Sequence, residues 1–405
     1  MKKISIFLFS ILILSTFFVQ AQWKQLSNFP GNNRSGAVGF GFSNNGFVGC
    51  GYDNFTYKKG FFSYDINNNS WADVAGLGGA NGGGLERNLA VSFVINNKGY
   101  VGTGQGGAPY LKDFWEYNSA NDTWTQKADF GGTARKGACG FSIGSHGYIG
   151  TGQDANGLRS DFWKFDAVNN NWSSVAGIPG ASRQFAVGFA ISTKGYIGTG
   201  DKGTMLKDFW EYDPQLDSWT QKAAFGGTAR KSAVAFSLAA EGYIGSGYDS
   251  TLNYTNDFWK FDPALNSWTQ MAACPGISRS AAVGFSVNGK GYFGTGYSDG
   301  NQLNDMWEFN PNLVSVNEIS NTEKVNVKVY PNPMINYTTI SIDGNSSLNN
   351  TITIFNSIGK LVSTIPMNKN CATFQRNGIS SGVYFYSITN ENSNTITIGK
   401  IIIND

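Results

Sequence analysis

At residues 183–227 the chain reads RQFAVGFAISTKGYIGTGDKGTMLKDFWEYDPQLDSWTQKAAFGG. Four short runs rich in apolar residues occur in this stretch, at 183–189, 195–200, 208–213 and 218–220. Each run has the length of a β-strand and is bounded by residues that favour turns. The stretch therefore predicts a unit of four strands.

The same unit recurs along the chain with a period of about 48 residues, which is typical of propeller blades. In every copy the first glycine of the second strand follows the opening arginine by 12 residues. A regular spacing of this kind predicts six equivalent blades that bury one another around an axis. The six arginines are Arg34, Arg87, Arg135, Arg183, Arg230 and Arg279.

The last copy lacks its fourth strand, because Val316 stands nine residues after Trp307, where five other copies carry a tryptophan. The missing strand is found at the other end of the chain. Residues 22–26 resemble a fourth strand, and Trp23 precedes Arg34 by 11 residues, a spacing that four other copies repeat. We expect this N-terminal strand to complete the sixth blade, which leaves no blade edge unpaired.

These residues resemble the kelch-repeat family, with a glycine-rich second strand, an aromatic residue followed by Asp, and a tryptophan one hairpin later. The resemblance covers residues 22–316 and implies a six-bladed kelch-type β-propeller in an all-β chain. In place of the usual Gly-Gly doublet, the second strand ends in Gly-Thr-Gly, Gly-Ser-Gly or Gly-Cys-Gly. The glycines allow this strand to approach its neighbours closely.

The repeat stops after Pro311, and a short polar linker at 317–324 leads into residues 325–405. Runs of Val, Ile and Thr at 338–342, 351–355, 382–388 and 395–403 predict a small Ig-like β-sandwich. Four ordered motifs in this segment resemble the C-terminal sorting domain of type IX secretion substrates. The motif residues are Tyr330, Pro331, Asn332, Pro333, Gly359, Gly382, Tyr384 and Lys400.

Residues 1–21 combine two lysines, an apolar run and a final small residue, as a signal peptide does. With the sorting-domain resemblance, this implies export by the Sec machinery and then by the type IX machinery of a Gram-negative bacterium. We expect a secreted or cell-surface protein with no transmembrane segment after cleavage, and a monomer. Release from the surface and attachment to it stay open.

The composition argues against several classes of function. The formal net charge is +2 with no basic run, so nucleic acid is not expected as a partner. The single histidine, His146, cannot supply a copper site resembling that of galactose oxidase, nor a Ser-His-Asp system. We expect no catalytic residue, no cofactor and no metal, while calcium in the Asn/Asp-rich loops stays open.

The cysteines show no paired spacing in the sequence. We therefore expect them to be small buried residues, with a disulfide left open: Cys50, Cys139, Cys274 and Cys371.

Two sets of residues are candidates for a ligand-binding rim. The six arginines begin the innermost strands, and they either bind a ligand or pair with the repeated acids Asp113, Asp161, Asp208, Asp257 and Asp305, which the first copy replaces with Gly60. The residue after each Gly-x-Gly varies while its surroundings repeat, which favours a role outside the scaffold. This second set is Tyr52, Gln105, Gln153, Asp201, Tyr248 and Tyr297.

We expect the rim to bind an extracellular glycan or protein without catalysis, because tyrosine faces beside amide and acid groups suit such ligands. Two alternatives remain open. One is a metal-independent enzyme acting on sugars, since some kelch propellers resembling sialic acid mutarotases need neither metal nor a nucleophilic histidine. The other is a purely structural component of the cell surface.

Overall fold

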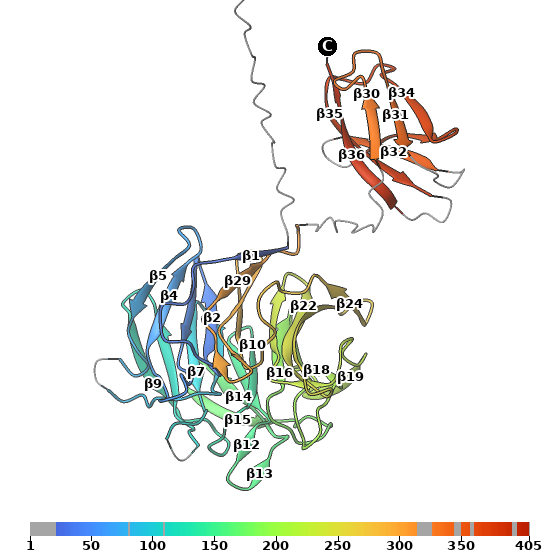
Figure 1. The fold of residues 1–405 in the computed structure, drawn as a ribbon. Helices are drawn as coiled ribbons and strands as arrows, with labels where there is room; N and C mark the ends of the chain where they lie inside the picture. The colour runs from blue at the N-terminus through green and yellow to red at the C-terminus, as the bar shows by residue number, and fades with distance from the viewer. Residues whose placement is uncertain are drawn as a thin grey trace, which may run out of the picture. The chain divides into compact units, whose positions relative to one another are not determined.

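The computed structural model describes residues 22–79, 82–107, 110–313, 326–343, 350–356, 360–390 and 395–404, and its compact units are Met1–Ser315 and Val316–Asp405. Every regular element in the described residues is a β-strand (Figure 1). The expected signal peptide at 1–21, the linker at 317–324, Val316 and Gly359 lie outside the described residues.

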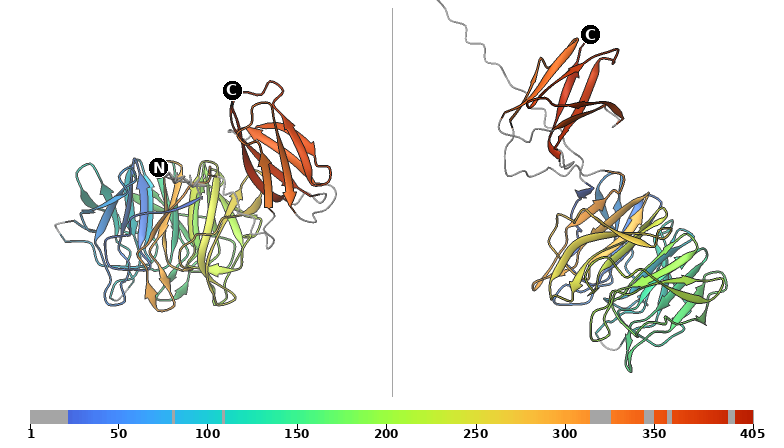
Figure 2. Two further views of the ribbon diagram at one scale, coloured as in Figure 1. Left: turned by 45° about the horizontal axis from the view of Figure 1, so that its top comes forward. Right: turned by 90° about the vertical axis from the view of Figure 1, so that its right-hand side faces the viewer.

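The first unit contains six four-stranded antiparallel blades, as predicted (Figures 1 and 2). Blade 1 comprises β2 (Val38–Phe42), β3 (Asn45–Gly49), β4 (Phe61–Asp65) and β5 (Ser70–Val74). Blade 2 comprises β6 (Val91–Ile95), β7 (Lys98–Gly102), β8 (Phe114–Asn118) and β9 (Thr123–Lys127). Blade 3 comprises β10 (Cys139–Ile143), β11 (His146–Gly150), β14 (Phe162–Asp166) and β15 (Asn171–Val175).

Blade 4 comprises β16 (Val187–Ile191), β17 (Lys194–Gly198), β18 (Phe209–Asp213) and β19 (Ser218–Lys222). Blade 5 comprises β21 (Val234–Leu238), β22 (Glu241–Asp249), β23 (Tyr254–Asp262) and β24 (Ser267–Met271). Blade 6 comprises β25 (Val283–Val287), β26 (Lys290–Gly294), β29 (Met306–Phe309) and β1 (Trp23–Gln25). Short additional strands in the loops are β12 (Gln153–Asp154), β13 (Gly157–Leu158), β20 (Arg230–Lys231), β27 (Tyr297–Ser298) and β28 (Asn301–Gln302).

The N-terminal strand closes the ring, which confirms the prediction. β1 pairs antiparallel with β29 (Figure 1), and the strand register places Trp23 opposite Phe309. The indole Nε1 of Trp23 donates to the carbonyl of Ala272 in blade 5 at 2.8 Å, and the fourth-strand tryptophan of each other blade donates to the preceding segment in the same way. These six hydrogen bonds form a closed circle around the outside of the propeller.

The glycine that opens each second strand lies against a phenylalanine of the preceding blade. A Cβ atom on Gly195 would overlap the ring of Phe141, and one on Gly46 would overlap Phe285 of blade 6, so the contact also crosses the closure. All six blades repeat this contact. Glycine is therefore required here by close packing between sheets.

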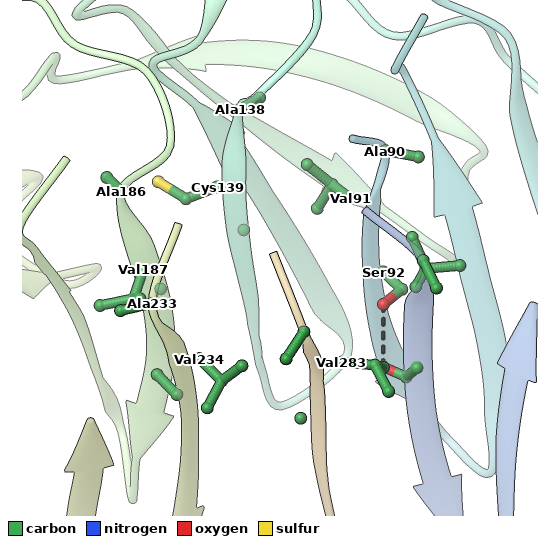
Figure 3. A pocket seen from close by; sticks show the side chains of 18 residues that line it. Ala90, Val91, Ser92, Ala138, Cys139, Ala186, Val187, Ala233, Val234 and Val283 are labelled. Atoms are coloured by element: carbon green, nitrogen blue, oxygen red, sulfur yellow. Dashed lines mark hydrogen bonds between the residues drawn. The ribbon is translucent and has the colours of Figure 1, made fainter. Parts of the chain in front are cut away.

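The innermost strands surround a narrow channel lined by small side chains such as Ala90, Val91 and Val187 (Figure 3). Ser92 donates from its hydroxyl to the carbonyl of Gly39 at 2.9 Å, which joins blades 2 and 1 at the wall. Hydroxyl and thiol groups also belong to the lining, from Ser92, Ser142, Ser237, Ser286 and Cys139.

The second unit is a sandwich of two antiparallel sheets. One contains β30 (Asn326–Tyr330), β31 (Tyr337–Asp343) and β34 (Cys371–Gln375), and the other contains β33 (Leu361–Pro366), β32 (Thr351–Asn356), β35 (Gly382–Thr389) and β36 (Thr395–Ile403). Fully buried Met334, Ile340, Ile352 and Ile388 belong to the core between the sheets. The sequence predicted this sandwich, but β30, β33 and β34 were not among the predicted strands.

The four cysteines are free thiols in this structure. Cys50, Cys139 and Cys274 are buried, as expected, and Cys371 is half-buried. Burial raises the pKa of Cys50 to about 12 and that of Cys139 to about 11. Thiols of this kind react slowly, because the thiolate is the nucleophile.

Candidate functional site at the propeller rim

The six repeated arginines are buried, with at most 3% of each side chain's surface exposed. Arg183 is representative: its Nε donates to the carbonyl of Ala181 at 3.0 Å, and its Nη1 donates to that of Thr199 at 3.1 Å. Both Nη atoms also reach the carboxylate of Asp208, each at 2.6 Å. Four hydrogen bonds therefore hold the guanidinium in place.

Five of the arginines form such a bidentate pair with the repeated aspartate. The same carboxylate accepts a hydrogen bond from the indole of the third-strand tryptophan, as Asp208 does from Trp210 at 2.8 Å. Burial alone would raise the pKa of Asp208, but hydrogen bonds from Arg183 and Trp210 outweigh it and hold the pKa below its usual value. The pairs are Arg87–Asp113, Arg135–Asp161, Arg183–Asp208, Arg230–Asp257 and Arg279–Asp305.

Arg34 is the exception, because Gly60 and Phe62 replace the aspartate and the tryptophan of its blade. Its guanidinium carbon lies 4.5 Å from the ring centroid of Phe29 and 6.0 Å from that of Phe62. Burial lowers the pKa of Arg34 to about 10. Arg34 thus lacks the ion pair of the other blades but keeps hydrogen bonds to the carbonyls of Asn32 and Cys50, at 3.1 and 3.0 Å, and the ring of Phe62 stands where the others have tryptophan.

This burial argues against one of the two interpretations of the arginines, that they bind a ligand at the rim. Their donors already bind carbonyls and carboxylates, so little surface remains for a ligand. The other interpretation, that they pair with the repeated aspartates, describes five of the six. The rim site must be sought in the residues that follow them.

The arginines also fix a strained backbone position, the middle residue of each Gly-x-Gly. Thr199 there has φ of 61°, in the left-handed region that β-branched residues avoid. The side chain of Arg183 donates a hydrogen bond to the carbonyl of Thr199. The next residue, Gly200, donates from its backbone amide to the carbonyl of Arg230 in the following blade at 2.8 Å. Six equivalent hydrogen bonds from backbone amides to arginine carbonyls join the blades in a circle.

A second circle of backbone hydrogen bonds surrounds the mouth of the channel. In each blade the residue two places after the arginine donates to its counterpart in the preceding blade, at 2.8 to 3.1 Å. All six have φ between 51° and 61°. The rim is therefore built on a rigid base, whose members are Gly36, Leu89, Gly137, Phe185, Ser232 and Ala281.

Just outside this base lie the six variable residues that follow Gly-x-Gly. All six are half-buried, so part of each side chain is accessible. Each pairs through its backbone with the residue directly after an arginine, as Asp201 does with Gln184. Those partners, which the sequence interpretation missed, are Ser35, Asn88, Lys136, Gln184, Lys231 and Ser280. They too vary among copies while the adjacent arginine repeats, and that signal could have identified them.

The rim has an aromatic side formed by blades 5, 6 and 1, which we call the tyrosine arc: Tyr248, Tyr254, Tyr297, Tyr52 and Tyr57. The ring of Tyr254 lies 5.0 Å from that of Tyr248 and 5.9 Å from that of Tyr297, between centroids. In blade 1, Tyr52 and Tyr57 are 5.2 Å apart. Two exposed apolar side chains, Leu252 and Ile277, occur in the loops of the same part of the ring.

Blades 2 to 4 present polar groups instead. Gln105, Gln153 and Asp201 occupy the variable position there. Lys231 binds the carboxylate of Asp201 at 2.8 Å, and the Nζ atom of Lys136 lies 5.4 Å from the ring centroid of Tyr110. One rim thus offers flat apolar faces on one side, and amides and charges on the other.

An amide-lined cleft of about 370 Å³ opens between the loops of blades 6 and 1. Asn33 donates to the carbonyl of Gln302 at 3.0 Å, and Asn32 donates to Asp53 at 2.8 Å. Exposed Phe55 lies at the edge of the cleft, with 88% of its surface accessible. The cleft therefore adds hydrogen-bonding groups within the aromatic half of the ring.

Three buried acids hold the rim loops through hydrogen bonds. Asp154 accepts hydrogen bonds from Thr133, Asn156 and Arg159. Burial opposes ionisation, but the bonds from Arg159 and Thr133 outweigh it and lower the pKa of Asp154 to about 2. The carboxylates of Asp53 and Asp249 likewise accept hydrogen bonds from backbone amides two to four residues further along their own loops. Among the described residues no group of His, Cys, Asp and Glu side chains is arranged to hold a metal ion.

The sorting-motif residues lie in the second unit. Tyr330 is exposed. Tyr384 is buried, and its hydroxyl donates to the carbonyl of Ser380 at 2.9 Å. Gly382 is the first residue of β35 and has a φ of 151°. Pro331 and Pro333 flank Asn332, whose side chain binds the backbone of β36 near Lys400. Gly359 lies outside the described residues.

The propeller resembles a solved structure, that of YjhT. The two share 15% sequence identity with a TM-score of 0.59, and the match covers 69% of this chain and 96% of YjhT. This likeness shows the β-propeller fold. No curated protein matches the sequence of the chain.

Residues 328–404 match the family described as the secretion system C-terminal sorting domain. None of the described residues forms a helix long and apolar enough to cross a membrane. The protein therefore carries a type IX sorting domain at its C-terminal end and is secreted through that system to the cell surface or the extracellular space.

Proposed function

We propose that the propeller is a non-enzymatic binding module that recognises a glycan or a protein outside the cell. The observation that carries this proposal is the tyrosine arc next to the amide-lined cleft. Sugar rings stack their apolar C–H faces on aromatic side chains and direct their hydroxyls to amides and carboxylates. The rigid hydrogen-bonded base beneath the rim favours a preformed site, which limits the entropy lost on binding.

The experiment is a glycan array and a pull-down with the secreted protein, followed by titration of the best ligand. Tyr254→Ala removes the ring that contacts both Tyr248 and Tyr297. We expect it to weaken binding roughly five- to tenfold, the equivalent of about one aromatic contact. Leu265→Ala is the matched control, since Leu265 is 74% exposed in the turn at the other end of β23. Equal affinity of the two variants would contradict the proposal.

A sugar-acting enzyme is the second candidate, and the observation that favours it is the ion pair between Asp201 and Lys231 on the rim. A carboxylate held next to an ammonium group is a pair that can move protons. Turnover of acidic sugars by the secreted protein, with loss in Asp201→Asn, would support this candidate. A stoichiometric place in a surface complex, with no ligand bound, would support a structural role instead.

The export route before the outer membrane is also part of the proposal. We propose that residues 1–21 are a signal peptide read by the Sec machinery, that residues 22–316 form a kelch-type propeller, and that 317–324 link it to the sorting domain at 325–405. The secreted protein is proposed to be a monomer. N-terminal sequencing of the exported chain is expected to begin near Gln22, and sedimentation is expected to give a single-chain mass.

A further inference from the structure

The rim loop of blade 6 differs from its five counterparts in one buried residue. In each blade the variable rim residue pairs through its backbone with a residue on the returning segment of the loop. In blade 6 that residue is Gln302, opposite Tyr297. The other blades carry an apolar or aromatic side chain there: Tyr57, Tyr110, Leu158, Met205 and Tyr254. The scaffold of a blade therefore does not require an amide at this position.

The amide of Gln302 is buried and only half satisfied. The residue has 6% of its surface exposed, and its Nε2 atom donates a long hydrogen bond to Oγ of Ser35 at 3.5 Å. Its Oε1 atom is buried and has no hydrogen-bond partner in the part of the chain that the structure describes. An unpaired buried amide oxygen destabilises a fold. A polar group that the scaffold neither requires nor satisfies points to a ligand.

Gln302 lines the amide-lined cleft between blades 6 and 1. It and Asp53 are the two buried residues of the lining, and the others are exposed: Asn32, Asn33, Asn54, Phe55 and Asn301. The last torsion of a glutamine side chain is broad, so Oε1 can turn toward a donor in the cleft at little cost. A hydroxyl group is such a donor, and the exposed asparagines offer further donors and acceptors around it.

Charge in the cleft favours an uncharged ligand. Asp53 is the one charged residue of the described lining, and its carboxylate already binds Nζ of Lys58 at 2.7 Å and Nδ2 of Asn32 at 2.8 Å. Asp299 adds a second acid, exposed in the turn between β27 and β28. A carboxylate or sulfate on the ligand would meet these acids with no lysine or arginine in the lining to bind it.

Aromatic rings lie on both sides of the cleft. On blade 1, the carboxylate of Asp53 accepts a hydrogen bond from the amide of Phe55 at 3.1 Å, which fixes the loop that carries this exposed ring. On blade 6, Tyr297 lies opposite Gln302, and its ring is 5.9 Å from that of Tyr254. A sugar unit stacks on one aromatic face at a time. Rings on both sides of a cleft therefore suit several consecutive units.

We propose that the cleft holds one unit of a neutral glycan chain, with a hydroxyl of that unit donating to Oε1 of Gln302. The neighbouring units stack on Phe55 and on the tyrosine arc. This inference rests on the proposed binding function and narrows it, because it assigns the ligand to one chemical class, the uncharged oligosaccharides.

The first test compares two classes of glycan on the secreted full-length protein. The probes are neutral unbranched oligosaccharides of glucose, mannose or N-acetylglucosamine, in increasing length, and oligogalacturonates of the same lengths. We expect a neutral series to bind, with affinity rising roughly three- to tenfold once the chain reaches rings on both sides of the cleft. We expect oligogalacturonates to bind roughly tenfold more weakly. Tighter binding of the acidic chains would overturn the inference.

The second test is Gln302→Leu, which removes the amide and installs the residue that blade 3 carries at the equivalent position, Leu158. It is expected to weaken binding of the best neutral oligosaccharide roughly three- to tenfold, the equivalent of one hydrogen bond. Its melting temperature is expected to be equal or higher, because the unpaired buried amide is gone. Met205→Leu is the matched control at the equivalent position of blade 4, and it is expected to change neither quantity.

If Gln302→Leu does not fold, Phe55→Ala replaces it, because that ring is 88% exposed. Its control is Val168→Ala, since Val168 is 80% exposed in the turn between β14 and β15 at the other end of blade 3. Unchanged affinity in the folded cleft variant would contradict the assignment of the cleft.

The outcomes separate this inference from the proposed function. An acidic glycan or a protein whose binding Tyr254→Ala weakens, while Gln302→Leu leaves it unchanged, would overturn the neutral-glycan assignment and leave the binding function standing. A secreted protein that binds none of the glycan probes and captures no protein would overturn both.

Discussion

Each buried arginine joins segments of the chain that are distant in sequence. Arg183 binds the carbonyl of Thr199 and the carboxylate of Asp208, and its own carbonyl accepts the amide of Gly152 from the preceding blade. A buried guanidinium is costly unless its donors are paired. The repeated arginine is therefore architectural, and it holds the strained residue on which the rim loops begin.

Asp208→Asn is expected to destabilise the propeller by about 3–5 kcal/mol, because it leaves the buried Arg183 charge without its ionic partner. Chemical denaturation of the secreted protein measures this change. Asp213→Asn is the control, since Asp213 pairs with Lys194 at the surface, and it is expected to change the unfolding free energy little. Equal effects of the two substitutions would contradict an architectural role for the buried pair.

Gly60→Asp is expected to stabilise blade 1, because it places a carboxylate at the position that pairs with arginine in the other five blades. A Cβ atom at Gly60 meets no heavy atom within 4 Å, so the side chain has room. The gain is expected to be about 1–3 kcal/mol, the range of a hydrogen bond to a charged group. A lower melting temperature than that of the natural chain would show that the faces of Phe29 and Phe62 already satisfy Arg34.

Stability is expected to fall in acid for the same reason. The folded pKa values of Asp161, Asp208, Asp257 and Asp305 are lowered, because arginine hydrogen bonds outweigh burial. Their stabilisation is therefore complete above the unfolded pKa of about 4, and is lost as the pH falls through the lower folded values. Melting curves at pH 7, 4 and 2.5 test this. Between pH 7 and pH 2.5, the stability of Asp208→Asn is expected to fall by less than that of the natural chain.

Among the strands, β1 has the largest structural consequence for its length. It supplies only Trp23–Gln25, yet it covers β29, which would otherwise be the exposed edge of blade 6. The ring of Trp23 lies 4.7 Å from that of Phe258 and 4.9 Å from that of Phe309. The strand thus joins blades 5 and 6 as well as closing the circle.

Trp23→Ala is expected to cost about 3–5 kcal/mol of unfolding free energy, as large core truncations do. It should also raise aggregation, because the edge of β29 becomes available for pairing. Light scattering and denaturation of the secreted protein measure the two effects. Lys24→Ala is the control in the same strand, since its side chain is exposed. A variant without Trp23 that matches this control would argue against closure by β1.

For the whole molecule, the features predicted from sequence are those fixed by the repeat. The spacing of Arg183 to Gly195 and the displaced Trp23 sufficed for the blades and their closure, because identical units must pack identically. The pairing of Asp201 with Gln184 was missed, because it depends on loop register. Tyr57 could have been found, because Tyr57 and Tyr110 both stand five residues after the variable position in loops of equal length. Tyr254 was missed because its loop is one residue longer than those of blades 1, 2, 3 and 6.

The rim on the arginine side of the propeller is proposed to bind a ligand. Hydrogen–deuterium exchange of the secreted protein, with and without the best glycan from the array, tests it most directly. With bound glycan, exchange is expected to be slower in the rim segments 246–257 and 295–305, and unchanged in the turn at 262–267 at the other end of blade 5. Slower exchange confined to that turn, or none in the rim loops at saturating glycan, would contradict it.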